Sequence, residues 1–387
     1  MTALAELIDA VIGVDTHRDT LAAAAVSALG GVLAHLQVPA DAGGYRESME
    51  FSNRHAPGAR CWAVEGASNY GAGLTAFLTN QGEQVVEVCR PKRPPRTGAR
   101  KSDAIDAVRA AREVLSSEHL IHPRSRGDRE ALRVLMSTRA SAVVARTRAI
   151  NHLKALIVSA PEDLRAPLRT MTSDAQISYC AALRTRPTRD LEYRTTTRVL
   201  KCTAQRVLAL RAEANELEAD INQLVTTMAP QLLALPGVGP VSAAQVLISW
   251  SHPGRFRSEA AFAMFSGAAP IPASSGRTTR HRLNRSGDRQ LTRALHTIVL
   301  TRARIDPTTQ AYITRRTAEG KTIREIKRAL KREASPASSS DSYKPPSNNR
   351  QRRTKPDKAP AERQWTPAPA SPERSPADSP KVALDGA

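Results

Sequence analysis

Apolar residues in the first part of the chain fall into short runs that are separated by turn residues. The run VIGVD covers residues 11–15, and TLAAAAVSA (20–28) and GVLAHLQV (31–38) follow, with Gly30 and Gly31 at the turn between them. Short apolar runs of this length, bounded by turn residues, are typical of β-strands. The pattern therefore predicts a three-stranded antiparallel meander at the start of the chain.

Helices and strands are then expected to alternate. The expected elements are a helix in the polar segment 41–55, a strand at CWAVEG (61–66), a helix at GAGLTAFLTNQG (71–82), a strand at QVVEVC (84–89) and a helix from about Ser102. The resulting order, βββαβαβ followed by a helix, is that of an α/β ribonuclease H-like (RuvC-like) fold. We assign this domain to residues 8–120.

The middle of the chain, residues 121–229, is predicted to be helical and basic. One helix is expected from Asp128 to about Ala160, and a second from about Leu191 to Met228. Apolar residues in the second helix recur at alternating steps of three and four, which is a heptad seam and predicts coiled-coil pairing. The partner is either the preceding helix or another subunit. The seam consists of Val207, Leu210, Ala214, Leu217, Ile221, Leu224 and Met228.

Two further units follow. Residues 230–333 are expected to form a mostly helical C-terminal domain of short helices, which opens with LLALPGVGPVSAAQVL (232–247). Beyond Ala334 the composition changes to Ser, Pro, Asn and charged residues, with almost no large apolar side chain. Such a segment cannot bury enough surface to offset the entropy of ordering, so residues 334–387 are predicted to be a disordered tail.

The charge of the chain points to a polyanion partner. Lys and Arg number 57 against 37 Asp and Glu, which gives a net charge of +20 over 387 residues. Neutralising phosphates releases counterions, so nucleic acid is the simplest partner for this excess. No apolar run has the roughly 18 residues of a spanning helix, and the N-terminus carries acidic residues rather than the cations of a signal peptide. The sequence thus predicts a cytoplasmic protein without a membrane partner, and its four cysteines, which lack metal-site spacing, are expected to be reduced.

Four acidic residues suggest a catalytic centre. Asp15 ends the first predicted strand, Glu65 ends the fourth, and Asp103 and Asp106 open the helix that follows. In a ribonuclease H-like sheet the two strand ends are neighbours and the helix packs across them. Each acid alone could be a solvated residue or a helix cap, but together they predict a site for Mg²⁺ or Mn²⁺, which select carboxylate oxygens. Two such ions about 4 Å apart can hold a phosphodiester and activate the attacking oxygen.

Basic residues lie beside this cluster. The segment RPKRPPRTGARKSD (90–103) leads directly into the acidic helix, and its cations, among them Arg100 and Lys101, are candidates for contacts to a nucleic-acid backbone. The alternative is an ordinary solvated loop.

The C-terminal unit contains a second candidate contact. LPGVGPVSAA (235–244) has the form of a helix-hairpin-helix turn, in which Gly237 and Gly239 permit close approach of the backbone to a phosphate. Glycine-rich turns of this kind also occur without a ligand.

A serine in a basic loop is the third candidate. Ser274 and Ser275 precede a run of cations that would stabilise the charge developing during attack on a phosphodiester. A turn residue or a phosphate contact is the ordinary interpretation of such a serine. The candidate nucleic-acid contacts in this loop are Arg277, Arg280, Arg282 and Arg285.

Several of these segments together resemble a known family. The chain resembles the DEDD transposases of the insertion-sequence family one-ten, over about residues 10–330. The segments that carry the resemblance, in the family's order, are VIGVDTH, VEGASNYG, RKSDAIDA, LPGVGPVSA, FSGAAPIPASSG, NRSGDRQL and AEGKT.

The resemblance implies a DNA recombinase of a bacterial insertion sequence. Asp15, Glu65, Asp103 and Asp106 would be the metal-binding tetrad, and Ser275 the nucleophile that becomes covalently linked to DNA, although the adjacent Ser274 leaves a one-residue ambiguity. The resemblance further implies DNA at the element ends and target, a structured guide RNA, and a homo-oligomer, dimer or tetramer, that associates through the helical segment.

Two rival functions remain open from the sequence. A RuvC-like structure-specific DNA endonuclease would need the four acids but not Ser275. A non-catalytic nucleic-acid-binding remnant of an element would need neither and would still bind RNA and DNA. An actin-like sugar kinase shares the opening strands, but no second Asp-Gly phosphate loop is present in the sequence.

Overall fold

The computed structural model describes residues 6–88, 102–117, 120–252, 255–256, 258–273, 281–282, 284 and 286–333. The predicted tail, 334–387, lies outside the described residues. Within the described ranges, no helix is both long and apolar enough to cross a membrane.

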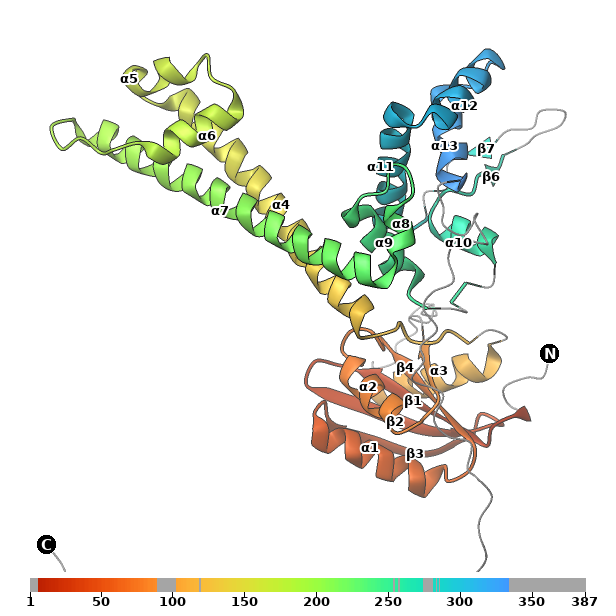
Figure 1. Cartoon of the computed structure of the whole chain (residues 1–387). Helices are drawn as coiled ribbons and strands as arrows, with labels where there is room; N and C mark the ends of the chain where they lie inside the picture. The colour runs from red at the N-terminus through yellow and green to blue at the C-terminus, as the bar shows by residue number, and fades with distance from the viewer. Residues whose placement is uncertain are drawn as a thin grey trace, which may run out of the picture. The chain divides into compact units, whose positions relative to one another are not determined.

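A five-stranded mixed sheet organises the first part of the chain (Figure 1). The strand order is β3-β2-β1-β4-β5, with β1–β2 and β2–β3 antiparallel, and β1–β4 and β4–β5 parallel. The predicted antiparallel meander is therefore confirmed. The strands are β1 (Ala10–Thr16), β2 (Thr20–Ser27), β3 (Val32–Pro39), β4 (Arg60–Glu65) and β5 (Val85–Val88).

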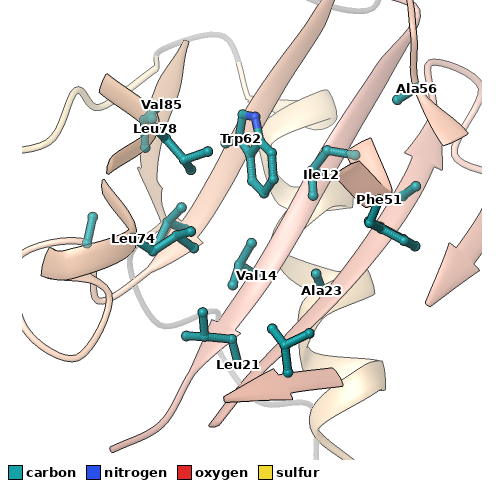
Figure 2. Packing of buried hydrophobic residues seen from close by; sticks show 14 of the residues in the cluster. Ile12, Val14, Leu21, Ala23, Phe51, Ala56, Trp62, Leu74, Leu78 and Val85 are labelled. Carbon is teal, nitrogen blue, oxygen red and sulfur yellow. The ribbon is translucent and has the colours of Figure 1, made fainter. Parts of the chain in front are cut away.

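Both faces of the sheet are covered by helices, because β1, β2 and β4 are apolar on both sides. On one face, Ile12 and Trp62 pack with Phe51 of α1 (Ala42–His55) and Leu74 of α2 (Ala72–Asn80), as Figure 2 shows. Burying one such large apolar side chain stabilises the fold by about 2 kcal/mol. The buried Trp62 donates from Nε1 to Glu83 Oε2 at 2.8 Å, and Glu83 also accepts from Arg60.

The opposite face is covered by α3 (Asp103–Ser116), which packs close to β1 at Gly13. A Cβ atom at Gly13 would lie 2.0 Å from the carbonyl oxygen of Ala107 and 2.8 Å from the amide nitrogen of Ala111, both in the backbone of α3. Such distances are far inside van der Waals contact, so only glycine permits this approach. Gly13 thereby sets the distance between α3 and β1, the strand that carries Asp15 near its end.

Two long helices make up the middle of the chain. They are α4 (Asp128–Ser159) and α7 (Leu191–Met228), and they pack against each other. Leu153 of α4 shares an apolar cluster with Leu200 and Val207 of α7, and Arg139 of α4 pairs with Glu218 of α7 at 2.6 Å. The heptad seam of α7 thus contacts α4 of the same chain, which was one of the two partners left open by the sequence.

The segment between the two long helices contains elements that the hydrophobic pattern did not predict. These are α5 (Glu162–Arg165), the 3₁₀ turn η2 (Ala166–Leu168) and α6 (Ser173–Ala182). Leu164, Leu168 and Ile177 are buried with the ends of α4 and α7. Each element is too short to show a helical repeat, which is why sequence periodicity missed them.

The C-terminal region is mostly helical, as predicted, but its helices are not all short and it also contains a two-stranded hairpin. The hairpin pairs β6 (Ile271–Pro272) with β7 (His281–Arg282). A core around Phe262, Leu291 and Leu295 joins this region to the ends of α4 and α7. The helices are α8 (Pro230–Leu233), α9 (Pro240–Trp250), α10 (Glu259–Phe265), α11 (Arg289–Ile305), α12 (Pro307–Ala318) and α13 (Ile323–Glu333).

Candidate functional site

The ends of β1 and β4 are neighbours, as the sequence predicted. The two strands run parallel, and their register pairs Val14 with Val64, so that Asp15 and Glu65 follow at adjacent positions. The hydroxyl of Thr16 donates to the carbonyl oxygen of Glu65 at 2.7 Å and ties the two strand ends together. Gly66, at φ +65°, then turns the chain away from the sheet.

The first turn of α3 adds Asp103 to this edge of the sheet. Asp15, His17 and Asp103 each offer one ligand atom, and the three atoms lie within 4.8 Å of one another. The Asp15 side chain is nearly buried, with 9% of its surface exposed, whereas His17 and Asp103 are each 39% exposed. Two of the four predicted acids are therefore brought together, along with a histidine.

His17 lies between the two carboxylates. Its Nε2 atom is 3.3 Å from Asp15 Oδ2 and 3.3 Å from Asp103 Oδ1. This nitrogen is buried and has no hydrogen-bond partner of acceptable geometry in the part of the chain that is described. The backbone N–H of His17 donates to the carbonyl oxygen of Thr20 at 3.0 Å, which fixes the residue at the β1–β2 turn.

The sequence analysis missed His17, although a signal was available. In extended backbone, residues two apart project to the same side. His17 follows Asp15 by two positions at the end of β1, so the spacing places its side chain on the side of the Asp15 carboxylate.

Glu65 and Asp106 lie near this group but are not part of it. Asp106 is one turn further along α3 than Asp103 and accepts from Arg109 Nη1 at 2.8 Å. Glu65 is half-buried at the end of β4. Within the described residues, Asp15 and Asp103 are therefore the two predicted acids that lie in contact with His17.

This donor set fits a divalent cation. Two carboxylates that converge, one of them nearly buried, repel each other unless a positive charge lies between them. The unsatisfied, buried Nε2 atom of His17 is a second indication, since buried polar atoms normally have a partner. Asp103 also lines a hollow of about 370 Å³, together with His35, Gln37 and Ser102.

The turn predicted to contact phosphate joins α8 to α9. Gly237 has φ +74°, and a Cβ there would lie 2.9 Å from the carbonyl oxygen of Ile298 in α11. Gly239 precedes Pro240, the first residue of α9, and the space around it is open. The turn lines a hollow of about 650 Å³ together with Arg139 and Glu218. The amides at the start of α9 are thus accessible to an anion.

Two arginines at the C-terminal end of α9 have a structural role. Arg129 is 4% exposed and donates from Nε and Nη2 to the carbonyl oxygen of Ile248 at the end of α9, both at 3.3 Å. Arg255 donates to the carbonyl oxygen of Ser249 at 2.6 Å. Burial, together with the charge of neighbouring Arg124, lowers the pKa of Arg129 to about 10. These arginines cap the negative end of α9.

Most of the other predicted contact residues lie outside the described residues. Arg282 is the exception, and it is exposed on β7. Residues 274–280 connect the two strands of the β6–β7 hairpin in sequence, so both candidate serines fall within that connection. The predicted residues outside the described ranges are Arg100, Lys101, Ser274, Ser275, Arg277, Arg280 and Arg285.

Two family models match the chain, one after the other. Residues 12–160 match a DEDD transposase family of the IS110 type, and residues 229–314 match the transposase family IS116/IS110/IS902. The first match contains all four predicted acids, and the second contains Ser275 and the Gly237–Gly239 turn.

Two proteins of insertion elements are similar to the chain. An uncharacterized 43.6 kDa protein of insertion element IS110 from Streptomyces coelicolor is 34% identical over 128 residues, which are 32% of this chain and 31% of that protein. The chain thus spans less than a third of that relative. An uncharacterized 42 kDa protein of insertion element IS900 from Mycobacterium paratuberculosis is 29% identical over 323 residues, covering 70% of this chain and 79% of that protein.

Proposed function

Because the chain belongs to the IS110 family of DEDD transposases, we propose that it cuts and rejoins DNA as the transposase of a bacterial insertion sequence. The observation that carries the proposal is the convergence of Asp15 and Asp103, from distant parts of the sequence, at one end of the sheet. Two carboxylates are not brought together for the sake of stability, since their mutual repulsion opposes folding.

We propose that Asp15, Glu65, Asp103 and Asp106 hold Mg²⁺ or Mn²⁺ in a ribonuclease H-like domain. When bound, such an ion withdraws charge from a phosphodiester and lowers the pKa of the attacking oxygen. The protein supplies the positions: β1 and β4 fix Asp15 and Glu65, and the Gly13 contact fixes the helix that carries Asp103. The ordered backbone at each position keeps the donors at constant separation.

Ser275 is proposed as the nucleophile, by resemblance to the family. Its Oγ would form a bond to the phosphorus while the bond from phosphorus to the leaving oxygen of the DNA strand breaks. The serine proton leaves Oγ, and the leaving oxygen takes up a proton to become a free hydroxyl. The cations that follow Ser275 in the sequence would stabilise the charge on the phosphoryl oxygens.

The remaining parts of the chain are assigned to binding and assembly. We propose a metal nuclease domain in residues 8–120, a coiled-coil segment in 121–229 through which subunits associate, and a second DNA-contacting domain in 230–333. The net charge of +20 fits a protein that holds DNA and a structured guide RNA. Accessible amides at the start of α9 support a phosphate contact there.

A donor plasmid that carries the complete element tests the proposal. Excision and rejoining would be measured by amplification across the new junctions, with wild type, Asp15→Asn and Ser275→Ala supplied separately. Protein bound to DNA would be sought on denaturing gels. We expect junctions and covalent adducts with the wild type only.

The same assay separates the proposal from its main rival. A structure-specific endonuclease would lose cutting in Asp15→Asn, but it would keep cutting and form no adduct in Ser275→Ala. If both variants recombine DNA as well as the wild type does, neither site is catalytic and the proposed function is wrong.

A further inference from the structure

We infer that His17 is a direct nitrogen ligand of the ion held by Asp15 and Asp103, so that the centre has a nitrogen donor in addition to its carboxylates. The inference rests on the proposed metal function and deepens it. His17 is not one of the four acids by which the family is described. It comes from the same strand end as Asp15, and its Nε2 atom lies 3.3 Å from an oxygen of each carboxylate.

The separations match those of neighbouring ligands on one ion. With metal–ligand distances of about 2.1 Å, adjacent donors are about 3.0 Å apart in octahedral geometry and about 3.4 Å apart in tetrahedral geometry. The Nε2 atom lies 3.3 Å from each of the two carboxylate oxygens. The third pair, the ligand oxygens of Asp15 and Asp103, lies within 4.8 Å. A single ion could therefore contact all three atoms after the side chains adjust.

The lack of a hydrogen bond at the Nε2 atom favours coordination of an ion over a purely structural role. A histidine that merely braced two carboxylates would donate a hydrogen bond to one of them. Instead, Nε2 is buried, both contacts lack hydrogen-bond geometry, and the atom has no other partner within the described residues. A buried nitrogen without a hydrogen bond destabilises the fold, and coordination to an ion removes that cost.

A nitrogen donor changes which ion the site prefers. Mg²⁺ favours oxygen ligands and loses its waters reluctantly, whereas transition metals accept imidazole readily. The site is therefore expected to bind Mn²⁺ more tightly than an all-carboxylate site would. Replacing His17 should weaken Mn²⁺ binding by about tenfold and Mg²⁺ binding much less.

Pulsed electron paramagnetic resonance of Mn²⁺ tests the assignment without any measurement of activity. The full chain would be loaded with less than one equivalent of Mn²⁺, and ¹⁴N coupling to the ion would be recorded. Protein labelled with ¹⁵N-histidine should replace the ¹⁴N pattern with a ¹⁵N pattern. His17→Asn should lose the coupling, whereas His152→Asn, which alters an exposed histidine of α4, should keep it.

Each outcome decides a different point. One outcome is that the wild type binds Mn²⁺, Asp15→Asn does not, and no nitrogen coupling is seen. This outcome would support the metal function and overturn the role of His17. Failure of the wild type to bind Mn²⁺ at all would overturn both. If His17→Asn does not fold, judged by circular dichroism, the isotope exchange in wild type and a His17→Gln variant still decide the question.

Discussion

The sheet region (residues 10–116) and the helical region (residues 128–333) present groups of opposite charge, and different kinds of structure hold those groups in place. In the sheet region, acidic side chains and His17 are attached to hydrogen-bonded strand ends and to a helix fixed by a backbone contact at Gly13. In the helical region, the candidate contacts are backbone groups of the Gly237–Gly239 turn, which lines a hollow together with Arg139. A divalent cation needs donors at fixed separations, whereas a polyanion mainly needs positive charge nearby. Rigid strand ends in the sheet region suit the first requirement, and the accessible turn in the helical region suits the second.

The largest expected effect comes from the carboxylates of the sheet region. Asp15→Asn and Asp103→Asn each keep the size of the side chain but remove a charge from the proposed ion. We expect recombination to fall at least about a thousandfold for each, which corresponds to about 4 kcal/mol of transition-state stabilisation. Junction formation on the donor plasmid measures it.

The matched control is Asp19→Asn, which alters an exposed acid at the nearby β1–β2 turn and should leave recombination unchanged. Normal recombination by Asp103→Asn would mean that the sheet region holds no catalytic ion. The two regions would then differ in the sign of their charged groups but not in catalytic function.

The next largest effect is expected at Gly13. Gly13→Val would place side-chain atoms where Ala107 and Ala111 now lie, so α3 must move away from β1. We expect the free energy of unfolding to fall by about 3 kcal/mol, and Mn²⁺ binding to be lost because Asp103 moves with α3. Chemical denaturation and titration calorimetry measure the two quantities.

Gly239→Ala is the control in the helical region, since the space around Gly239 is open and its φ is ordinary. Its stability should change by less than about 0.5 kcal/mol. Equal losses of stability in Gly13→Val and Gly239→Ala would contradict the view that the sheet region depends on close packing at Gly13.

A smaller effect separates structural cations from nucleic-acid contacts in the helical region. Arg129→Met removes the donors to the carbonyl oxygen of Ile248, and we expect a loss of about 2 kcal/mol in thermal unfolding experiments. Arg133→Met, one turn along α4, removes an exposed pair with Glu130 and should cost less than about 0.5 kcal/mol. Unchanged stability in Arg129→Met would contradict a structural role for Arg129.

The smallest effect concerns an acid of the sheet region that is structural. Hydrogen bonds from Arg60, and secondarily from Trp62, lower the pKa of Glu83 below its usual 4.5. The stabilisation from Glu83 is therefore complete above that pH and is lost as the pH falls through its lower, folded-state value. Glu83→Gln should cost about 1 kcal/mol at pH 7 and should flatten the acid limb of the stability curve.

Unfolding would be followed from pH 7 to pH 3 for Glu83→Gln and for a control, Glu50→Gln, at an exposed position of α1. The control should retain the acid limb of the wild type. An unchanged acid limb in Glu83→Gln would show that other carboxylates dominate acid unfolding.

The sequence predicted the sheet region well because its elements have strong local signals. Runs such as VIGVD end where the strands end, and the adjacency of Asp15 and Glu65 follows from strand order alone. The approach of Asp103 to Asp15 depends on how α3 packs on β1. The sequence pattern predicted the helix, but it did not predict the Gly13 contact that positions it.

What the sequence did not predict depends on packing between distant segments. The two-residue spacing from Asp15 indicates on which side His17 lies, but its role depends on Asp103, which is remote in sequence. The short α5 and α6 helices are stabilised by α4 and α7 and not by their own amphipathic pattern. The β6–β7 hairpin has two residues in each strand, too few to alternate visibly.

The close contact between Gly13 and α3 also bears on the order of events during synthesis. Asp15 and His17 leave the ribosome well before Asp103, and domains fold from the N-terminus as they emerge. A nascent chain that ends before α3 has the strand end but lacks the third donor of the group. If these three residues hold an ion as proposed, its binding has to wait until α3 has docked, and an unfinished chain would not bind it in the same way.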